Sequence, residues 1–190
     1  GILEKETGYS EKSKAKIVPH LSQCLGVYDQ AFERYRGEKF KKKPEYLLSA
    51  LWINYQKPND FNPPHDHDGA LSFVTYLQIP EELKKENKAY KGQSCGPGGI
   101  QFLYGEGRRD SVTYMSFMPE ENDMYIFPSW LKHWVAPYKS NCTRISVSGN
   151  VHDSAPLNNI VKFGPKYIEA KEKGVNKEEQ KYLEELKTKL

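Results

Sequence analysis

Cysteine is scarce in this sequence. The 190 residues contain three cysteines, Cys24, Cys95 and Cys142, and their spacing forms no pairs. An odd and sparse count argues against a disulfide framework and favours a reducing compartment. We therefore expect a cytoplasmic protein rather than a disulfide-bonded extracellular domain.

Long apolar runs and a strong charge of one sign are missing as well. No apolar run approaches the length of a membrane-spanning helix, and no core of a signal peptide is visible. The formal net charge of +3 is too small to imply nucleic-acid binding by itself. Much of the lysine lies in residues 39–43 and 162–190, where we expect solvated surface. Neither a membrane nor a nucleic acid is therefore an expected partner.

The sequence does contain a series of short segments that are rich in β-branched and aromatic residues. Its 13 Tyr and 8 Phe favour sheets, and its length suits one domain with a sizeable core. Turn-forming residues separate the expected strands, which lie at 45–57, 71–79, 100–104, 111–118, 123–128, 133–138 and 143–151. Many short strands with regular turn signals predict a sandwich or barrel, mainly β with flanking helices.

The remaining segments predict helices and loops around these strands. Apolar residues at helical spacing predict an amphipathic helix over 21–36, which ends at Gly37. Residues 1–16 are polar and are expected to be irregular, and the charged, glycine-rich segment 80–99 is expected to be a loop or lid. A charged helix is predicted over 176–190. Its apolar face would dock on the sheet or on a second subunit, which would form a homodimer.

The segment Asn-Pro-Pro-His-Asp-His-Asp, residues 62–68, is the strongest chemical signal. Successive side chains on a strand point to opposite faces, so His65 and His67 would share one face and Asp66 and Asp68 the other. Carboxylates and imidazoles are both metal ligands, and the segment is therefore a candidate metal site. For a His-x-His pattern alone, a solvated turn rich in histidine is the alternative.

A third histidine turns this segment into part of a larger arrangement. His133 follows an apolar Phe-Pro-Ser-Trp-Leu-Lys segment at the start of a later expected strand. Two ligands two residues apart, with a third on a neighbouring strand, can occupy one face of an octahedron, as in the non-haem iron sites. Imidazole also suits zinc, nickel and copper, so the type of ligand does not determine the metal.

Arg144 and Ser146 lie on one face of the last major strand. A buried arginine on a strand is costly unless an anion pairs with it. A ligand carboxylate would be a good partner, because the guanidinium fork matches it with two hydrogen bonds. A salt bridge to a carboxylate of the protein is the alternative. Trp52, Asn54 and Gln56 share one face of the strand that leads into the histidine segment.

These segments together resemble the 2-oxoglutarate- and Fe(II)-dependent oxygenases. In particular they resemble the small "putative 2OG-Fe(II) oxygenase" branch found in bacteria and tailed phages. The resemblance covers roughly residues 45–151, and its matching stretches are 52–55, 65–67 continuing into 71–77, 127–133 and 144–148. It implies a double-stranded β-helix (jelly-roll) core. The chain would then divide into an N-terminal extension with a supporting helix (1–44), the catalytic core (45–151) and a C-terminal extension with the charged helix (152–190).

The resemblance also assigns metal ligands. His65 corresponds to the first ligand and His133 to the distal one, while His67 stands where the family commonly has Asp or Glu. Strand alternation favours a site of three histidines. Asp66 or Asp68 could instead reach the metal through a local bulge, or water could complete a site of two histidines.

Four further residues are assigned to the cosubstrate by the same resemblance. Arg144 lies eleven residues after His133 and would bind the C5 carboxylate of 2-oxoglutarate, with Ser146 as a secondary donor. Asn54 would lie near the cosubstrate, and Tyr76 would be a second donor to the carboxylate. Ordinary core packing is the alternative for Tyr76.

The function implied by the resemblance is oxidative decarboxylation of 2-oxoglutarate, coupled to hydroxylation of a C–H bond, with Fe(II) as metal. No catalytic residue is expected beyond the metal ligands. The substrate is open between a small molecule and a protein or peptide, a prolyl residue being one example, and a phage-encoded enzyme would act in the host cytoplasm. The alternatives are a cupin-like dioxygenase with three histidines and no 2-oxoglutarate, and a metal-binding β domain without catalysis.

Overall fold

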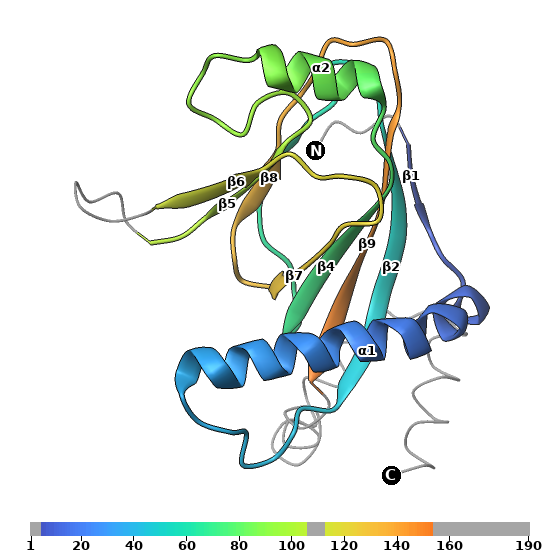
Figure 1. The fold of residues 1–190 in the computed structure, drawn as a ribbon. Helices are drawn as coiled ribbons and strands as arrows, with labels where there is room; N and C mark the ends of the chain where they lie inside the picture. Colours follow the sequence, from blue (N-terminus) through green and yellow to red (C-terminus); the bar gives the residue numbers. More distant parts are fainter. Residues whose placement is uncertain (1–4, 106–112, 154–190) are drawn as a thin grey trace, which may run out of the picture. The chain divides into compact units, whose positions relative to one another are not determined.

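The computed structural model describes residues 5–105 and 113–153, which form two antiparallel sheets and two helices (Figure 1). The larger sheet has the order β1-β2-β9-β4-β7. Its strands are β1 (Lys5–Gly8), β2 (Tyr46–Gln56), β9 (Arg144–Asp153), β4 (Leu71–Gln78) and β7 (Met124–Pro128). The smaller sheet has the order β3-β8-β5-β6, with β3 (Asn62–His65), β8 (His133–Val135), β5 (Ile100–Leu103) and β6 (Tyr114–Phe117).

From β2 onward the chain crosses between the two sheets from strand to strand, except that β5 and β6 follow each other in the smaller sheet. β2, β4, β7 and β9 lie in the larger sheet, and β3, β5, β6 and β8 lie in the smaller one. Such a path, in which strands distant in sequence become neighbours, forms the double-stranded β-helix or jelly-roll. The predicted fold is therefore confirmed, and each expected strand has a counterpart in the described residues.

Side-chain alternation along β4 explains how one strand contributes to two cores. Leu71 and Phe73 belong to an apolar cluster with residues of the first helix, whereas Val74 and Tyr76 belong to a second cluster with β5 and β7. Residues on opposite faces of a strand bury themselves in different layers. The second cluster lies beside the candidate site described below.

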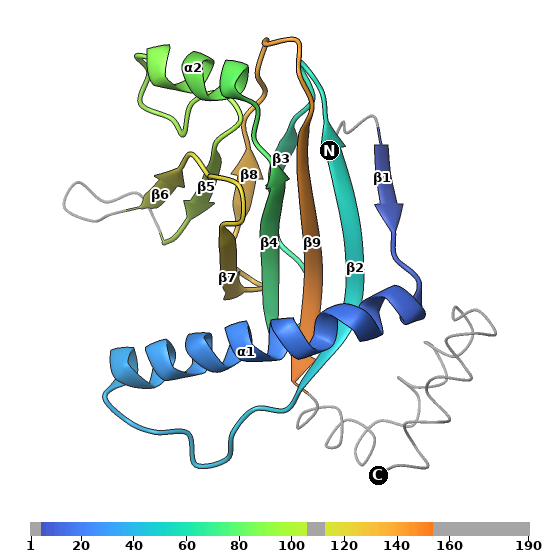
Figure 2. The same ribbon diagram turned by 45° about the vertical axis from the view of Figure 1, so that its right-hand side comes forward.

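The first helix, α1 (Glu11–Arg36), runs across the strands of the larger sheet (Figure 2) and buries Leu21 and Leu25 against it. It ends at Gly37, as predicted, in the left-handed conformation (φ 72°). Its start was predicted wrongly, because the helix begins ten residues earlier, at Glu11. The Ser10 side chain accepts from the Ser13 N–H at 3.4 Å, and such a cap stabilises a polar first turn that has little apolar periodicity.

Two other predictions about local structure need correction. Residues 1–16 are not irregular throughout, because β1 pairs with β2 before α1 begins. The first half of the expected loop 80–99 is a helix, α2 (Glu81–Ala89), which buries Leu83. The side chain of Asn87 then donates to the carbonyls of Cys95 and Pro97, at 3.1 and 2.9 Å, and holds the glycine-rich segment against this helix.

Neither described helix has the length and apolar character of a membrane-spanning segment. The helix predicted over 176–190, and with it the proposed contact to a second subunit, lies outside the described residues.

Candidate metal centre and its pocket

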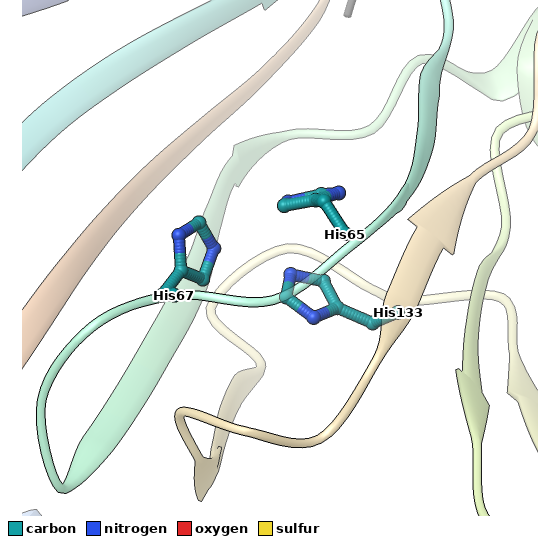
Figure 3. Close-up of side chains that lie close together, drawn as sticks. All are labelled: His65, His67 and His133. Carbon is teal, nitrogen blue, oxygen red and sulfur yellow. The ribbon is translucent and has the colours of Figure 1, made fainter.

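Three histidines converge in the described structure. His65 ends β3 and His133 begins β8, and the two are direct partners in the β3–β8 pairing. His67 follows two residues after His65 on the segment that leads to β4, and all three side chains point toward a common space (Figure 3). One nitrogen from each ring lies within 4.8 Å of the others. This spacing allows one metal ion to bind all three.

Backbone carbonyls determine which ring nitrogens are available for a metal. Nδ1 of His65 lies 2.7 Å from the Pro63 carbonyl, and Nδ1 of His133 lies 3.0 Å from the Leu131 carbonyl. A carbonyl can only accept, so each Nδ1 carries the proton and each Nε2 keeps a lone pair. Histidine ligands of metals are commonly oriented through such contacts of the second nitrogen.

His67 is positioned through its backbone. Its N–H donates to the Ser129 carbonyl at 3.0 Å, and its ring centre lies 5.6 Å from that of Trp52. The Ser129 hydroxyl contacts the Ser72 hydroxyl at 3.1 Å, and Ser72 donates to the Asn150 side chain at 3.0 Å. This buried network joins the turn that carries His67 to β4 and β9.

Burial keeps two of the imidazoles neutral. Burial, with a smaller effect from the neighbouring His65 and His67, lowers the pKa of His133 from its ordinary value to about 4, although the contact with the Leu131 carbonyl acts in the opposite direction. Burial also lowers the pKa of His67, with a smaller effect from His65. Neutral imidazole is the form that binds metals, and desolvation therefore prepares the site at neutral pH.

The structure does not bring the two neighbouring carboxylates into this cluster. The side chains of Asp66 and Asp68 are exposed, while His65 and His67 are partly buried. The alternation expected of a strand is thus continued beyond the end of β3.

The same pocket contains a buried cation. Arg144 is 3% exposed, and its Nη1 donates to Oε1 of Gln56 at 3.1 Å. Within the described residues, its Nε and Nη2 have no hydrogen-bond partner, and neither does the buried hydroxyl of Tyr76. The guanidinium carbon lies 4.8 Å from the centre of the Tyr76 ring. Unpaired buried donors around a cation are costly unless a ligand anion completes them.

The predicted site residues line one cavity, apart from the alternative ligands Asp66 and Asp68. It is lined by the three histidines, Arg144, Ser146, Asn54 and Tyr76. The cavity measures about 50 Å³ of space open to the centre of a water molecule, which is room for several waters. Tyr76 and Ser146 are direct partners in the β4–β9 pairing, so their side chains lie on one face.

Other polar residues of the pocket were given no role from the sequence. Gln56 accepts a hydrogen bond from Arg144, Nδ2 of Asn62 lies 3.4 Å from Nε2 of His65, and the Ser148 hydroxyl accepts from the Asn54 side chain at 3.2 Å. Gln56 shares the strand face of Asn54, which is a signal that sequence alone provides. Its contact with Arg144 joins residues 88 positions apart, and only the folded sheet reveals it.

Comparison with known proteins identifies the family of the chain. A family model described as "Putative 2OG-Fe(II) oxygenase" matches residues 50–150. No curated protein matches the sequence. Among solved structures, an oxidoreductase of the 2OG-Fe(II) oxygenase family from Burkholderia pseudomallei is similar at 17% identity, with a TM-score of 0.44. That match covers 63% of this chain and 50% of the other, so this chain spans about half the length of the Burkholderia protein.

Two prolyl hydroxylase structures are also distantly similar. The viral collagen prolyl hydroxylase of Paramecium Bursaria Chlorella virus-1, solved with 2OG, is 13% identical, with a TM-score of 0.47 and coverage of 78% of this chain and 79% of that one. A Pseudomonas putida prolyl-4-hydroxylase is 19% identical, with a TM-score of 0.40 and coverage of 69% and 64%. The family model, in contrast, spans 101 of the 190 residues and includes all three histidines and Arg144. The chain therefore belongs to the 2-oxoglutarate- and Fe(II)-dependent oxygenase family.

Proposed function

We propose that the protein is a 2-oxoglutarate- and Fe(II)-dependent hydroxylase whose metal ligands are His65, His67 and His133. The observation that carries the proposal is the buried Arg144 guanidinium, with two unpaired N–H groups in the same cavity as three clustered histidines. A metal-binding domain without a cosubstrate would gain nothing from this unpaired cation. The same holds for a three-histidine dioxygenase that acts without 2-oxoglutarate.

The histidine cluster fits a divalent iron ion. Three neutral nitrogens can hold one face of the metal and leave the other positions to cosubstrate, substrate and oxygen. His67 takes the place of the usual carboxylate in this proposal, because Asp66 and Asp68 are exposed. The metal centre then lacks the negative charge that a carboxylate ligand would supply.

The other polar groups of the pocket fit a dicarboxylate. The two free nitrogens of Arg144 form one edge of the guanidinium fork, which matches a carboxylate with two parallel hydrogen bonds. The Tyr76 hydroxyl is unpaired and buried, and it can donate to the same carboxylate. Burial raises the pKa of Tyr76, so this hydroxyl keeps its proton at any physiological pH. Ser146 is a further donor, and Asn54, on the adjacent strand β2, also lines the cavity.

When bound, iron and 2-oxoglutarate would supply the oxidative chemistry: 2-oxoglutarate is oxidised to succinate and CO₂ with one atom of O₂, and the other oxygen atom enters a C–H bond of the substrate, which becomes C–OH. The protein's own residues position the reactants. Arg144 and Tyr76 orient the cosubstrate through its distal carboxylate, and the histidines place the metal at the other end of the molecule. Apolar side chains of the cavity, including Val74, Phe127 and Val135, limit the access of water.

Substrate, partner and location follow from the sequence and extend this proposal. A prolyl residue of a protein is the substrate class suggested by the family resemblance, which is an analogy. The three cysteines are free and favour a cytoplasmic location, which would be the host cytoplasm for a phage-encoded enzyme. A homodimer through the predicted C-terminal helix stays a prediction, as do the boundaries at residues 44 and 151.

Succinate formation tests the proposed activity. The wild-type protein, incubated with Fe(II), 2-oxoglutarate and O₂, should release succinate slowly even without its substrate, whereas His133→Ala should release none. Arg34→Met provides a control, because it replaces an exposed residue of α1 outside the pocket and should behave as wild type. Equal succinate in wild type and His133→Ala would contradict the assignment.

A further inference from the structure

Gln56 lies on β2 beside the buried cation, and its side-chain amide has only one possible orientation. The residue is 1% exposed, and its Nε2 donates to the carbonyls of Asp60 and Ala136, at 2.8 and 3.2 Å. Both amide hydrogens are thereby used by groups that can only accept. Oε1 must therefore face away from these carbonyls, toward the guanidinium of Arg144, where it accepts from Nη1 at 3.1 Å.

The backbone around this pair is held as well. The Tyr138 hydroxyl donates to the carbonyl of Gln56 and accepts from the backbone N–H of Arg144 at 3.2 Å. Tyr138 is itself buried, with an exposed fraction of 1%. Gln56 and Arg144 are therefore tied together both through their side chains and through one shared tyrosine.

Gln56 is uncharged, and this affects how Arg144 can bind a ligand. The Gln56 side chain accepts from Nη1 and leaves Nε and Nη2 without a partner in the described part of the chain. These two nitrogens form the edge of the fork that binds a carboxylate bidentately. A carboxylate in place of the amide would neutralise the cation, and an apolar side chain would leave Nη1 unpaired and the fork free to rotate.

We propose that Gln56 is the positioning residue that gives the pocket its preference for a 2-oxo acid with a distal carboxylate. Through its hydrogen bond to Nη1, Gln56 orients Nε and Nη2 of Arg144 toward the cavity. Because Gln56 is uncharged, it leaves the positive charge of Arg144 available to the carboxylate of the ligand. This inference rests on the proposed function, because it assumes that Arg144 receives the distal carboxylate of 2-oxoglutarate. It concerns the choice of cosubstrate and not the oxidative chemistry.

A pair of ligands separates this role from a merely structural one. 2-Oxoglutarate and 2-oxopentanoate have the same chain length and the same metal-binding end, but the second has a methyl group in place of the distal carboxylate. Calorimetric titration of the Mn(II)-loaded protein with each ligand gives a ratio of affinities. In Gln56→Glu, 2-oxoglutarate should bind at least about 30-fold more weakly, the lower end of the cost of disturbing a buried charge pair. The affinity for 2-oxopentanoate should stay unchanged.

Gln56→Met is the second variant, since it removes all three hydrogen bonds of the amide, including the one from Arg144, without adding a charge. Gln56→Met should lower the ratio of the affinity for 2-oxoglutarate to that for 2-oxopentanoate by less than Gln56→Glu does. Only the affinity for 2-oxoglutarate should change. If Gln56→Glu does not fold, as judged by circular dichroism, Gln56→Met still tests the proposal through its own ratio. A wild-type ratio in the folded variants, or an equal loss for both ligands, would overturn the role of Gln56. Failure of the wild type to bind 2-oxoglutarate would instead overturn the proposed function, and this inference with it.

Discussion

Replacing Arg144 by methionine should make the ligand-free protein more stable while removing its response to 2-oxoglutarate. The guanidinium is buried, and two of its N–H groups have no partner among the described residues. Unpaired buried donors cost about 1–3 kcal/mol each, so their removal should gain about 4 kcal/mol. Loss of the Gln56 hydrogen bond leaves Oε1 as a buried acceptor without a partner, and together with loss of the contact with the Tyr76 ring this should cost about 3 kcal/mol.

The net expectation is a gain of about 1 kcal/mol in the free energy of unfolding, or a rise of about 2–4 °C in Tm for a chain of this size. Thermal unfolding should be followed with Mn(II) alone and with Mn(II) plus 2-oxoglutarate. The cosubstrate should raise the Tm of the wild type, because it binds only the folded state, and should leave that of Arg144→Met unchanged. The control Arg34→Met removes an exposed cation, and 2-oxoglutarate should raise its Tm as much as that of the wild type.

Two results would refute this reasoning. A ligand-free Arg144→Met protein that is less stable than the wild type would mean that the guanidinium is well satisfied without a ligand. An undiminished rise in Tm with 2-oxoglutarate would mean that Arg144 does not bind the cosubstrate.

The remaining predictions concern the metal cluster. In the metal-free protein, NMR should find that His133 titrates near pH 4. Because burial favours the neutral form of His133, the free energy of unfolding should fall as the pH drops from about 6.5 toward 4. Titration of His133 near pH 6.5 would refute the effect of burial. His67→Ala should lose bound iron, measured by metal analysis, whereas the double variant Asp66→Asn/Asp68→Asn should keep it; the reverse pattern would assign the third ligand to a carboxylate. Ser72→Ala should weaken metal binding by about 10-fold or more, since the hydroxyl network behind the His67 turn is lost, and unchanged affinity would show that the network is not needed.

Much of the site could be predicted because its signals are local. Strand alternation placed His65 and His67 on one face, and the structure has them in one cluster with His133. Arg144 and Ser146 also lie two residues apart on one strand, and both line the cavity. Two residues that are two positions apart on a strand share a face whatever the rest of the fold is, so such pairs can be predicted from the sequence alone.

Other features depend on contacts that no local pattern contains. The hydrogen bond between Gln56 and Arg144 requires the pairing of β2 beside β9, which brings together residues 88 positions apart. The second helix has a single buried apolar residue, Leu83, so its nine residues show no clear apolar period. The early start of α1 likewise depends on the cap at Ser10 and not on apolar spacing.

The most direct test of the central claim is an anaerobic titration of the Fe(II)-loaded protein with 2-oxoglutarate, followed in the visible spectrum. Binding of the 2-oxo acid to iron at the three histidines should produce a charge-transfer band in the wild type. In Arg144→Met, the band should require a much higher concentration of 2-oxoglutarate. A wild-type protein that holds iron but shows no band at any 2-oxoglutarate concentration would contradict the account.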